Sequence, residues 1–150
     1  MEHHHAKQLN WAFLAISFIG LTDALYLSVE RLKGQAVICN IIQGCNKVTS
    51  STYSTLLHVP VAYLGVIYYF FIFLLALWFL ATDNHTSLTL AAGMTVVGLL
   101  ASAWFVYLQI FVIKAICLYC ILSATTSTLL FIFGTYYLVR KLKKVATYHH

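Results

Sequence analysis

The chain has 150 residues, of which 61% are hydrophobic and only 9% are charged, with a mean hydropathy of +0.85. A water-soluble domain of this length needs about a quarter of its residues charged to cover its surface, so these values exclude that class and indicate a membrane protein. The net charge of +5 does not indicate nucleic-acid binding. Four of the nine basic residues cluster at positions 140–144, directly after an apolar run. Such a cluster is typical of the cytoplasmic end of a membrane span.

Four apolar stretches account for most of the chain: 9–29, 61–81, 88–113 and 115–139. Each is near the roughly 20 residues that cross a bilayer as a helix. The last two form an almost unbroken run that, as one helix, would reach about 78 Å, more than two bilayers. Lys114 lies near its middle, and a charge in hydrocarbon is costly, so we expect the chain to turn there at an interface. The sequence therefore predicts an all-α membrane protein, a four-transmembrane-helix bundle that forms a single domain over residues 1–150.

A polar loop, 30–60, joins the first two spans, and Pro60 suits the first turn of the second helix. Because each span reverses the side of the membrane, this loop and the Lys114 turn share one face, and both termini lie on the other. The basic residues divide nearly evenly, five on the terminal face and four opposite, and the dense C-terminal cluster favours cytoplasmic termini. We therefore expect an extracytoplasmic loop in an oxidising compartment. The protein would be multi-pass, in the inner membrane of a prokaryote or the endoplasmic reticulum membrane of a eukaryote.

Four cysteines form two close pairs on the loop face. Cys39 and Cys45 lie in the polar loop, and Cys117 and Cys120 open the fourth span. An i to i+3 spacing puts the second pair on one helix face, where the free N–H groups of a helix N-terminus stabilise a thiolate. The pattern favours thiol–disulfide redox chemistry over two alternatives that stay open, a structural disulfide and a four-cysteine zinc site. We expect no metal.

These residues resemble the vitamin K epoxide reductase family, and in particular its prokaryotic homologues, the disulfide-bond-forming quinone reductases. The resemblance rests on Cys39, on the run CNKVTSS at 45–51, on VPVAYLG at 59–65 and on CLYC at 117–120, in this order and with this membrane placement. It covers nearly the whole chain. It implies a membrane enzyme that uses a quinone of the ubiquinone, menaquinone or vitamin K type as electron acceptor.

The resemblance also implies an electron relay through the two cysteine pairs. Cys39 would meet the partner's thiol, Cys45 would exchange with Cys117, and Cys120 would face the quinone. The implied disulfides are Cys39–Cys45, Cys117–Cys120 and a transient Cys45–Cys117. Ser51 matches a serine placed near the reactive sulfurs, and a helix cap is the alternative explanation of Ser50 and Ser51. Many bacterial members carry a fused thioredoxin-like domain, and this sequence ends soon after the fourth span, so the resemblance implies a separate thioredoxin-like partner, in trans.

Four further residues are candidates for the quinone pocket. Val61 and Ala124 stand where vertebrate members place an Asn and a Tyr that hydrogen-bond the vitamin K head group, which weakens a claim of epoxide reduction. Tyr63 and Tyr119 are aromatic candidates, although tyrosines also gather at membrane interfaces. Outside this set, Asp23, late in the first span, is a candidate for a functional role because it is an intramembrane carboxylate; an interfacial carboxylate paired with a basic or tyrosine group is the equal alternative.

Two other functions fit the same sequence. One is a non-catalytic membrane scaffold in which a Cys39–Cys45 disulfide staples the external loop. The other is a vitamin K epoxide reductase proper. Membrane lipid and a thiol protein are the expected partners of the favoured function, and nucleic acid is not.

Overall fold

The apolar stretches fold as four long helices. The computed structural model describes residues 2–34, 45–56 and 59–148. The long helices are α1 (Glu2–Leu32), α3 (Val61–Thr82), α4 (His85–Tyr107) and α5 (Leu118–Tyr148). Four segments are long and apolar enough to cross a membrane: Ala6–Leu32, Val61–Thr82, His85–Ile113 and Leu118–Lys143. The predicted four-helix membrane fold is confirmed.

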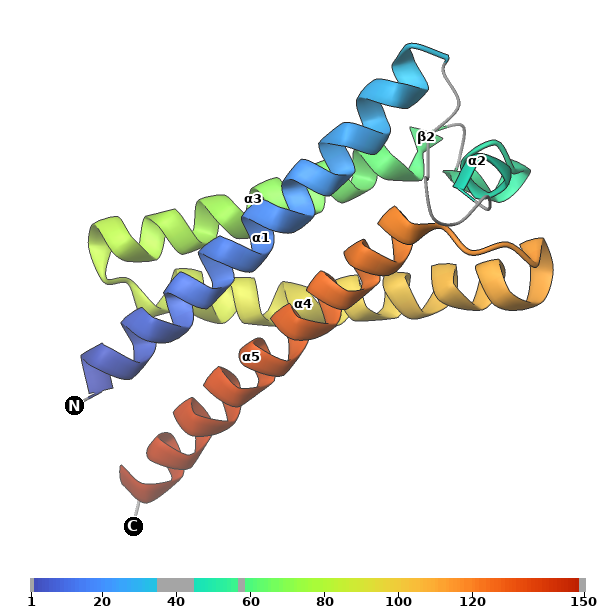
Figure 1. The fold of residues 1–150 in the computed structure, drawn as a ribbon. Coiled ribbons are helices and arrows are strands. Elements are labelled where there is room, and N and C mark those ends of the chain that lie inside the picture. The colour runs from blue at the N-terminus through green and yellow to red at the C-terminus, as the bar shows by residue number, and fades with distance from the viewer. Residues whose placement is uncertain (1, 35–44, 57–58, 149–150) are drawn as a thin grey trace.

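The helices form a bundle with two distinct ends. α1 packs against α3 and α5, and α4 packs against α5 and α3. Both termini lie at one end, and the short elements between α1 and α3 lie at the other, beside the start of α5 (Figure 1). An apolar core fills the half near the termini, with buried side chains from every long helix, including Phe13, Ile72, Leu88 and Leu130.

The link between α3 and α4 is shorter than predicted, and α4 begins at His85 rather than near residue 88. Asp83 ends α3 in the left-handed conformation (φ 50°), and Asn84 then caps α4. The Asn84 side-chain oxygen accepts a hydrogen bond from the Thr86 N–H at 3.0 Å. A side-chain acceptor at this position satisfies an N–H that the helix start leaves free, so the polar residues of the predicted link extend the helix.

The predicted turn at Lys114 is present, but the fourth helix begins at Leu118, three residues after the predicted start. α4 continues as a π-helix, η2 (Leu108–Ile113), and Lys114 closes it in the left-handed conformation (φ 52°). The backbone carbonyl of Gln109 accepts from the Ala115 N–H at 3.1 Å. A second bond, described below, holds the segment as far as Cys117 outside the helix.

The described part of the loop contains short elements only: α2 (Cys45–Thr49), the 3₁₀ turn η1 (Thr52–Ser54), and strands β1 (Thr55–Leu56) and β2 (Val59–Pro60). The strands pair antiparallel, with Thr55 opposite Pro60. Arg31, at the end of α1, donates to the Thr49 carbonyl and to the Ser54 hydroxyl, each at 2.7 Å. This guanidinium ties α2 and η1 to the membrane helices.

Candidate active site

Cys117 caps the N-terminus of α5. Its carbonyl accepts from the Ile121 N–H at 3.0 Å, the first backbone bond of the helix, and its side chain is fully buried. Hydrogen bonding from the Cys120 thiol lowers the pKa of Cys117 to about 7, against the opposing effect of burial, and the backbone N–H groups of Cys120 and Tyr119 add to the lowering. A thiolate here takes the place of the side-chain oxygen that caps most helices.

Gln109 fixes the position of Cys117. Its side-chain oxygen accepts from the Cys117 backbone N–H at 2.9 Å, and the side chain is 2% exposed. The amide orientation follows from this bond, because an N–H needs an oxygen opposite it. Gln109 therefore anchors the non-helical segment that delivers Cys117 to the end of α5.

Cys45 lies at the start of α2 and is also fully buried. Leu27, Cys45, Val48 and Cys117 form one buried cluster, and Cys120 packs at its edge. Cys45 is disulfide-bonded, whereas Cys117 and Cys120 carry free thiols. Cys39 lies outside the described residues, so the predicted Cys39–Cys45 disulfide stays a prediction. The structure brings together the other three predicted cysteines.

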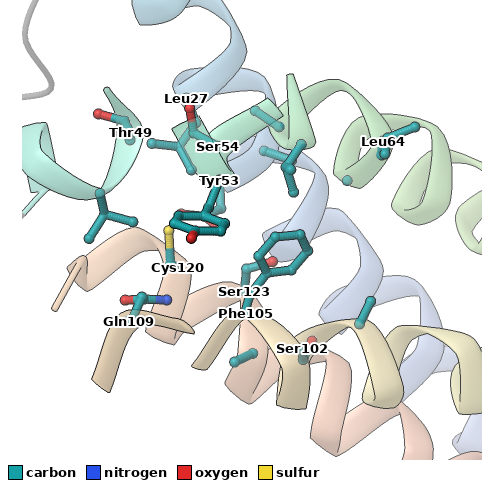
Figure 2. Close-up of a pocket in the computed structure, with 18 of the residues that line it drawn as sticks. Leu27, Thr49, Tyr53, Ser54, Leu64, Ser102, Phe105, Gln109, Cys120 and Ser123 are labelled. Carbon is teal, nitrogen blue, oxygen red and sulfur yellow. The ribbon is translucent and has the colours of Figure 1, made fainter. Parts of the chain in front are cut away.

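A cavity of about 750 Å³ opens beside Cys120, in the half of the bundle away from the termini. Its size is that of pockets that take small organic ligands. Figure 2 shows the Cys120 sulfur pointing into the cavity, whose wall includes Leu64 of α3, Phe105 of α4 and Ser123 of α5. Tyr53 and Ser54 of η1 complete the wall from the loop. The free thiol of Cys120 therefore borders an apolar space within the helix bundle.

The predicted pocket residues divide into two groups. Val61 and Ala124 line the cavity, whereas Tyr63 and Tyr119 are not part of its wall. Tyr119 instead packs against the ring of Tyr26, with the ring centroids 4.9 Å apart. The position of Tyr119 on the helix turns its ring away from the cavity. The presence of a tyrosine in the sequence does not reveal this direction.

Ser51 lines the cavity as well, as its predicted place near the sulfurs requires. Its hydroxyl donates to the Val48 carbonyl at 2.7 Å and makes no capping bond to η1, although Ser51 precedes that turn. The hydroxyl therefore does not cap η1, but it satisfies a carbonyl in the last turn of α2, so a cap at the end of that helix still explains this residue. The bond to Val48 fixes the chain where it leaves α2.

Three site residues were not predicted: Gln109, Arg31 and Phe105. Gln109 carried a usable signal, since it is a polar side chain inside an apolar span, where polar groups are costly. Arg31 and Phe105 carried none, because a basic residue at a helix end and an aromatic residue in a span are both common in membrane proteins. Among the described residues, no group of three His, Cys, Asp or Glu side chains is placed to hold a metal ion.

Comparison with known proteins shows the family of the chain. No curated protein matches the chain. The model of the vitamin K epoxide reductase family matches residues 11–135, a range that contains all four cysteines and most of all four spans. The chain therefore belongs to the vitamin K epoxide reductase family and is a membrane oxidoreductase.

Proposed function

We propose that this protein oxidises the thiols of a separate thioredoxin-like protein and passes the electrons through two cysteine pairs to a quinone. Cys39 and Cys45 would form the outer pair, which meets the partner. Cys117 and Cys120 would form the inner pair, which meets the quinone. The product is a disulfide in the partner protein.

The positions of three cysteines support this proposal. Cys45 and Cys117 share a buried cluster, and Cys120, three residues further along α5, lines the cavity. Disulfide exchange requires a thiolate to reach a sulfur directly, through a mixed disulfide. This arrangement supports a relay from the loop to the cavity.

Each exchange step conserves electrons. The Cys45 thiolate attacks Cys117 in the oxidised inner pair, so a Cys45–Cys117 bond forms and Cys120 leaves as a thiolate. Cys39 then attacks Cys45, so the outer disulfide forms and Cys117 leaves. A thiol of low pKa is the better leaving group, and the lowered pKa of Cys117, about 7, favours this second step at neutral pH.

Oxidation of the inner dithiol then releases two electrons and two protons, which convert a quinone to a quinol. The cavity suits this substrate because it is lined mainly by apolar side chains of the membrane helices, with Cys120 on its wall. A quinone of the ubiquinone, menaquinone or vitamin K type dissolves in the bilayer. It would enter between the helices, while the partner approaches from water.

We also propose an orientation of the protein in the membrane. Cys45, Cys117 and Cys120 lie at the end of the bundle opposite the termini (Figure 1). With both termini in the cytoplasm, the cysteines lie on the extracytoplasmic side, where disulfides persist. The cluster of basic residues near the C-terminus supports this orientation.

The test is quinone reduction by the purified protein in detergent, supplied with a reduced thioredoxin-like protein. Cys45→Ala, Cys117→Ala and Cys120→Ala should each abolish turnover, because each removes one link of the relay. Thr82→Ala, an exposed change at the opposite end of the bundle, is the matched control and should keep full turnover. Variants that lack one member of a pair should also accumulate mixed disulfides.

Other outcomes select the alternatives. A Cys120→Ala variant with full turnover would overturn the assignment of the inner pair. No turnover with several quinones and partners, and cysteines that resist exchange, would select the membrane scaffold with a stapled loop. Conversion of vitamin K epoxide at a rate comparable with quinone reduction would select an epoxide reductase.

A further inference from the structure

A buried carboxyl group faces the same cavity and has no role in the relay described above. Asp23 of α1 is 6% exposed and lines the cavity together with Cys120. Neither of its carboxyl oxygens has a hydrogen-bond partner in the described part of the chain. An unpartnered buried carboxyl group destabilises a fold by a few kcal/mol, so a structural role does not explain it.

The surroundings of Asp23 contain the redox sulfurs. The carboxyl group interacts electrostatically with Cys117 and Cys120, and also with Tyr69 of α3 and Tyr119 of α5. Both tyrosines keep their protons at physiological pH. Arg31, two helical turns further along α1, is the basic residue on the cavity wall, and its guanidinium is engaged with Thr49 and Ser54. Asp23 is therefore the acidic group best placed to exchange protons with the inner pair.

We propose that Asp23 carries the proton that must move from the Cys120 thiol to the quinone inside the membrane. This inference rests on the proposed quinone reduction. The inner wall of the cavity lies among membrane helices, away from the loop end, so a protein group on that wall would shorten the path of the proton. A carboxylate that stands free of hydrogen bonds can accept a proton and release it again without breaking existing contacts.

Proton transfer and electron transfer are coupled in this step. The S–H bond of Cys120 breaks, and its proton moves to the Asp23 carboxylate, directly or through one water. The two electrons of the inner dithiol pass to the quinone as the Cys117–Cys120 bond forms. Asp23 then gives its proton to one quinone oxygen and becomes a carboxylate again. The second proton comes from water at the loop end, where the Cys117 thiolate had released its own.

The test is a single turnover of pre-reduced protein mixed with a short-chain ubiquinone analogue. Asp23→Asn keeps the size of the side chain and should slow quinone reduction about a hundredfold, in the range of general acid–base catalysis. It should also remove one ionisation from the pH profile of this step. Asp23→Glu should recover part of the rate. Asp83→Asn, an exposed aspartate at the opposite end of the bundle, is the matched control and should behave as wild type.

Two further measurements separate proton transfer from a structural role. Trapping of the Cys45–Cys117 mixed disulfide should be unchanged in Asp23→Asn, because that exchange does not use the quinone. Thermal stability in detergent should stay equal or rise, since a buried amide is less costly than a carboxylate. Loss of stability together with loss of trapping would instead show that Asp23 only supports the fold.

The inference is overturned if Asp23→Asn reduces the quinone at the wild-type rate with the wild-type pH profile. Failure of the proposed function looks different. In that case the wild-type protein itself would reduce no quinone, whatever residue stands at position 23.

Discussion

The two halves of the helix bundle use their interior differently. Near the termini, the helices close around packed apolar side chains such as Phe13, Leu88 and Leu130. Near the loop, they border a cavity of about 750 Å³ that is lined by Cys120 and by Asp23, whose carboxyl oxygens have no hydrogen-bond partner among the described residues. Cavities and unpartnered polar groups both lower stability. The comparison indicates that the packed half stabilises the fold and that the hollow half leaves space for a ligand beside Cys120.

The largest effect should come from filling the hollow half. Ala124→Phe adds a ring to the cavity wall beside Ser123. Overpacking typically costs 1–3 kcal/mol, and each 1.4 kcal/mol is tenfold in affinity, so the KM for a quinone analogue should rise about tenfold to hundredfold. Steady-state quinone reduction measures this, and thermal stability should change little.

Leu129→Phe is the control for that experiment, because Leu129 lies on the same helix but is exposed. It should keep the wild-type KM. An unchanged KM in Ala124→Phe would show that the quinone binds elsewhere. The hollow half would then have no assigned function.

A smaller effect, on stability alone, should come from the packed half. Leu130 is fully buried in the apolar core, and Leu130→Ala should lower the free energy of unfolding by about 2 kcal/mol. The low end of the usual range applies, because lipid is as apolar as the core and only packing is lost. Unfolding in a denaturing detergent measures the change, with exposed Leu129→Ala as the control. Equal effects of the two changes would contradict the assignment of stability to this half.

The smallest effect concerns the boundary between the membrane and the loop, where Cys117 lies. The thiolate absorbance of the reduced protein should titrate with a midpoint near pH 7, since the pKa of Cys117 is lowered to about 7. The thiol dominates below that pH and the thiolate above it. Cys120→Ala removes the hydrogen bond that lowers the pKa most, so the midpoint should move upward, and Cys120→Ser, which keeps a donor, should move it less. A midpoint that stays in place in Cys120→Ala would show that the helix N-terminus alone stabilises the thiolate.

Much of the fold could be predicted, because its signals are local. Apolar runs of membrane length gave the four helices, and a single charge at Lys114 gave the turn between the last two. The start of α5 was misplaced because it depends on the Gln109 side chain, which holds the backbone of Cys117 from eight residues away. Helix boundaries set by such side-chain bonds leave no periodic trace in the sequence.

The candidate site could be predicted in part. The spacing of Cys117 and Cys120 predicted that the two thiols lie together at the start of the last helix, and the position of Asp23 within an apolar span made it a candidate. The enclosure of the cavity could not be predicted, because it depends on contacts between distant segments, such as Arg31 with Ser54 across 23 positions. Tyr119 shows the same difficulty, since only the packing on Tyr26 decides which way its ring faces.

The π-helix η2 changes the direction in which the residues after it face. An α-helix advances by about 100° per residue, and a π-helical turn takes in one residue more than an α-helical turn. The extra residue rotates the residues that follow relative to α4. Within η2 itself, Leu108 and Gln109 are buried, and the stretch from Ile110 to Val112 is exposed. Removal of one residue from η2 would turn the Lys114–Cys117 segment by about a quarter of a revolution. The direction in which the Cys117 side chain faces thus depends on the number of residues in η2.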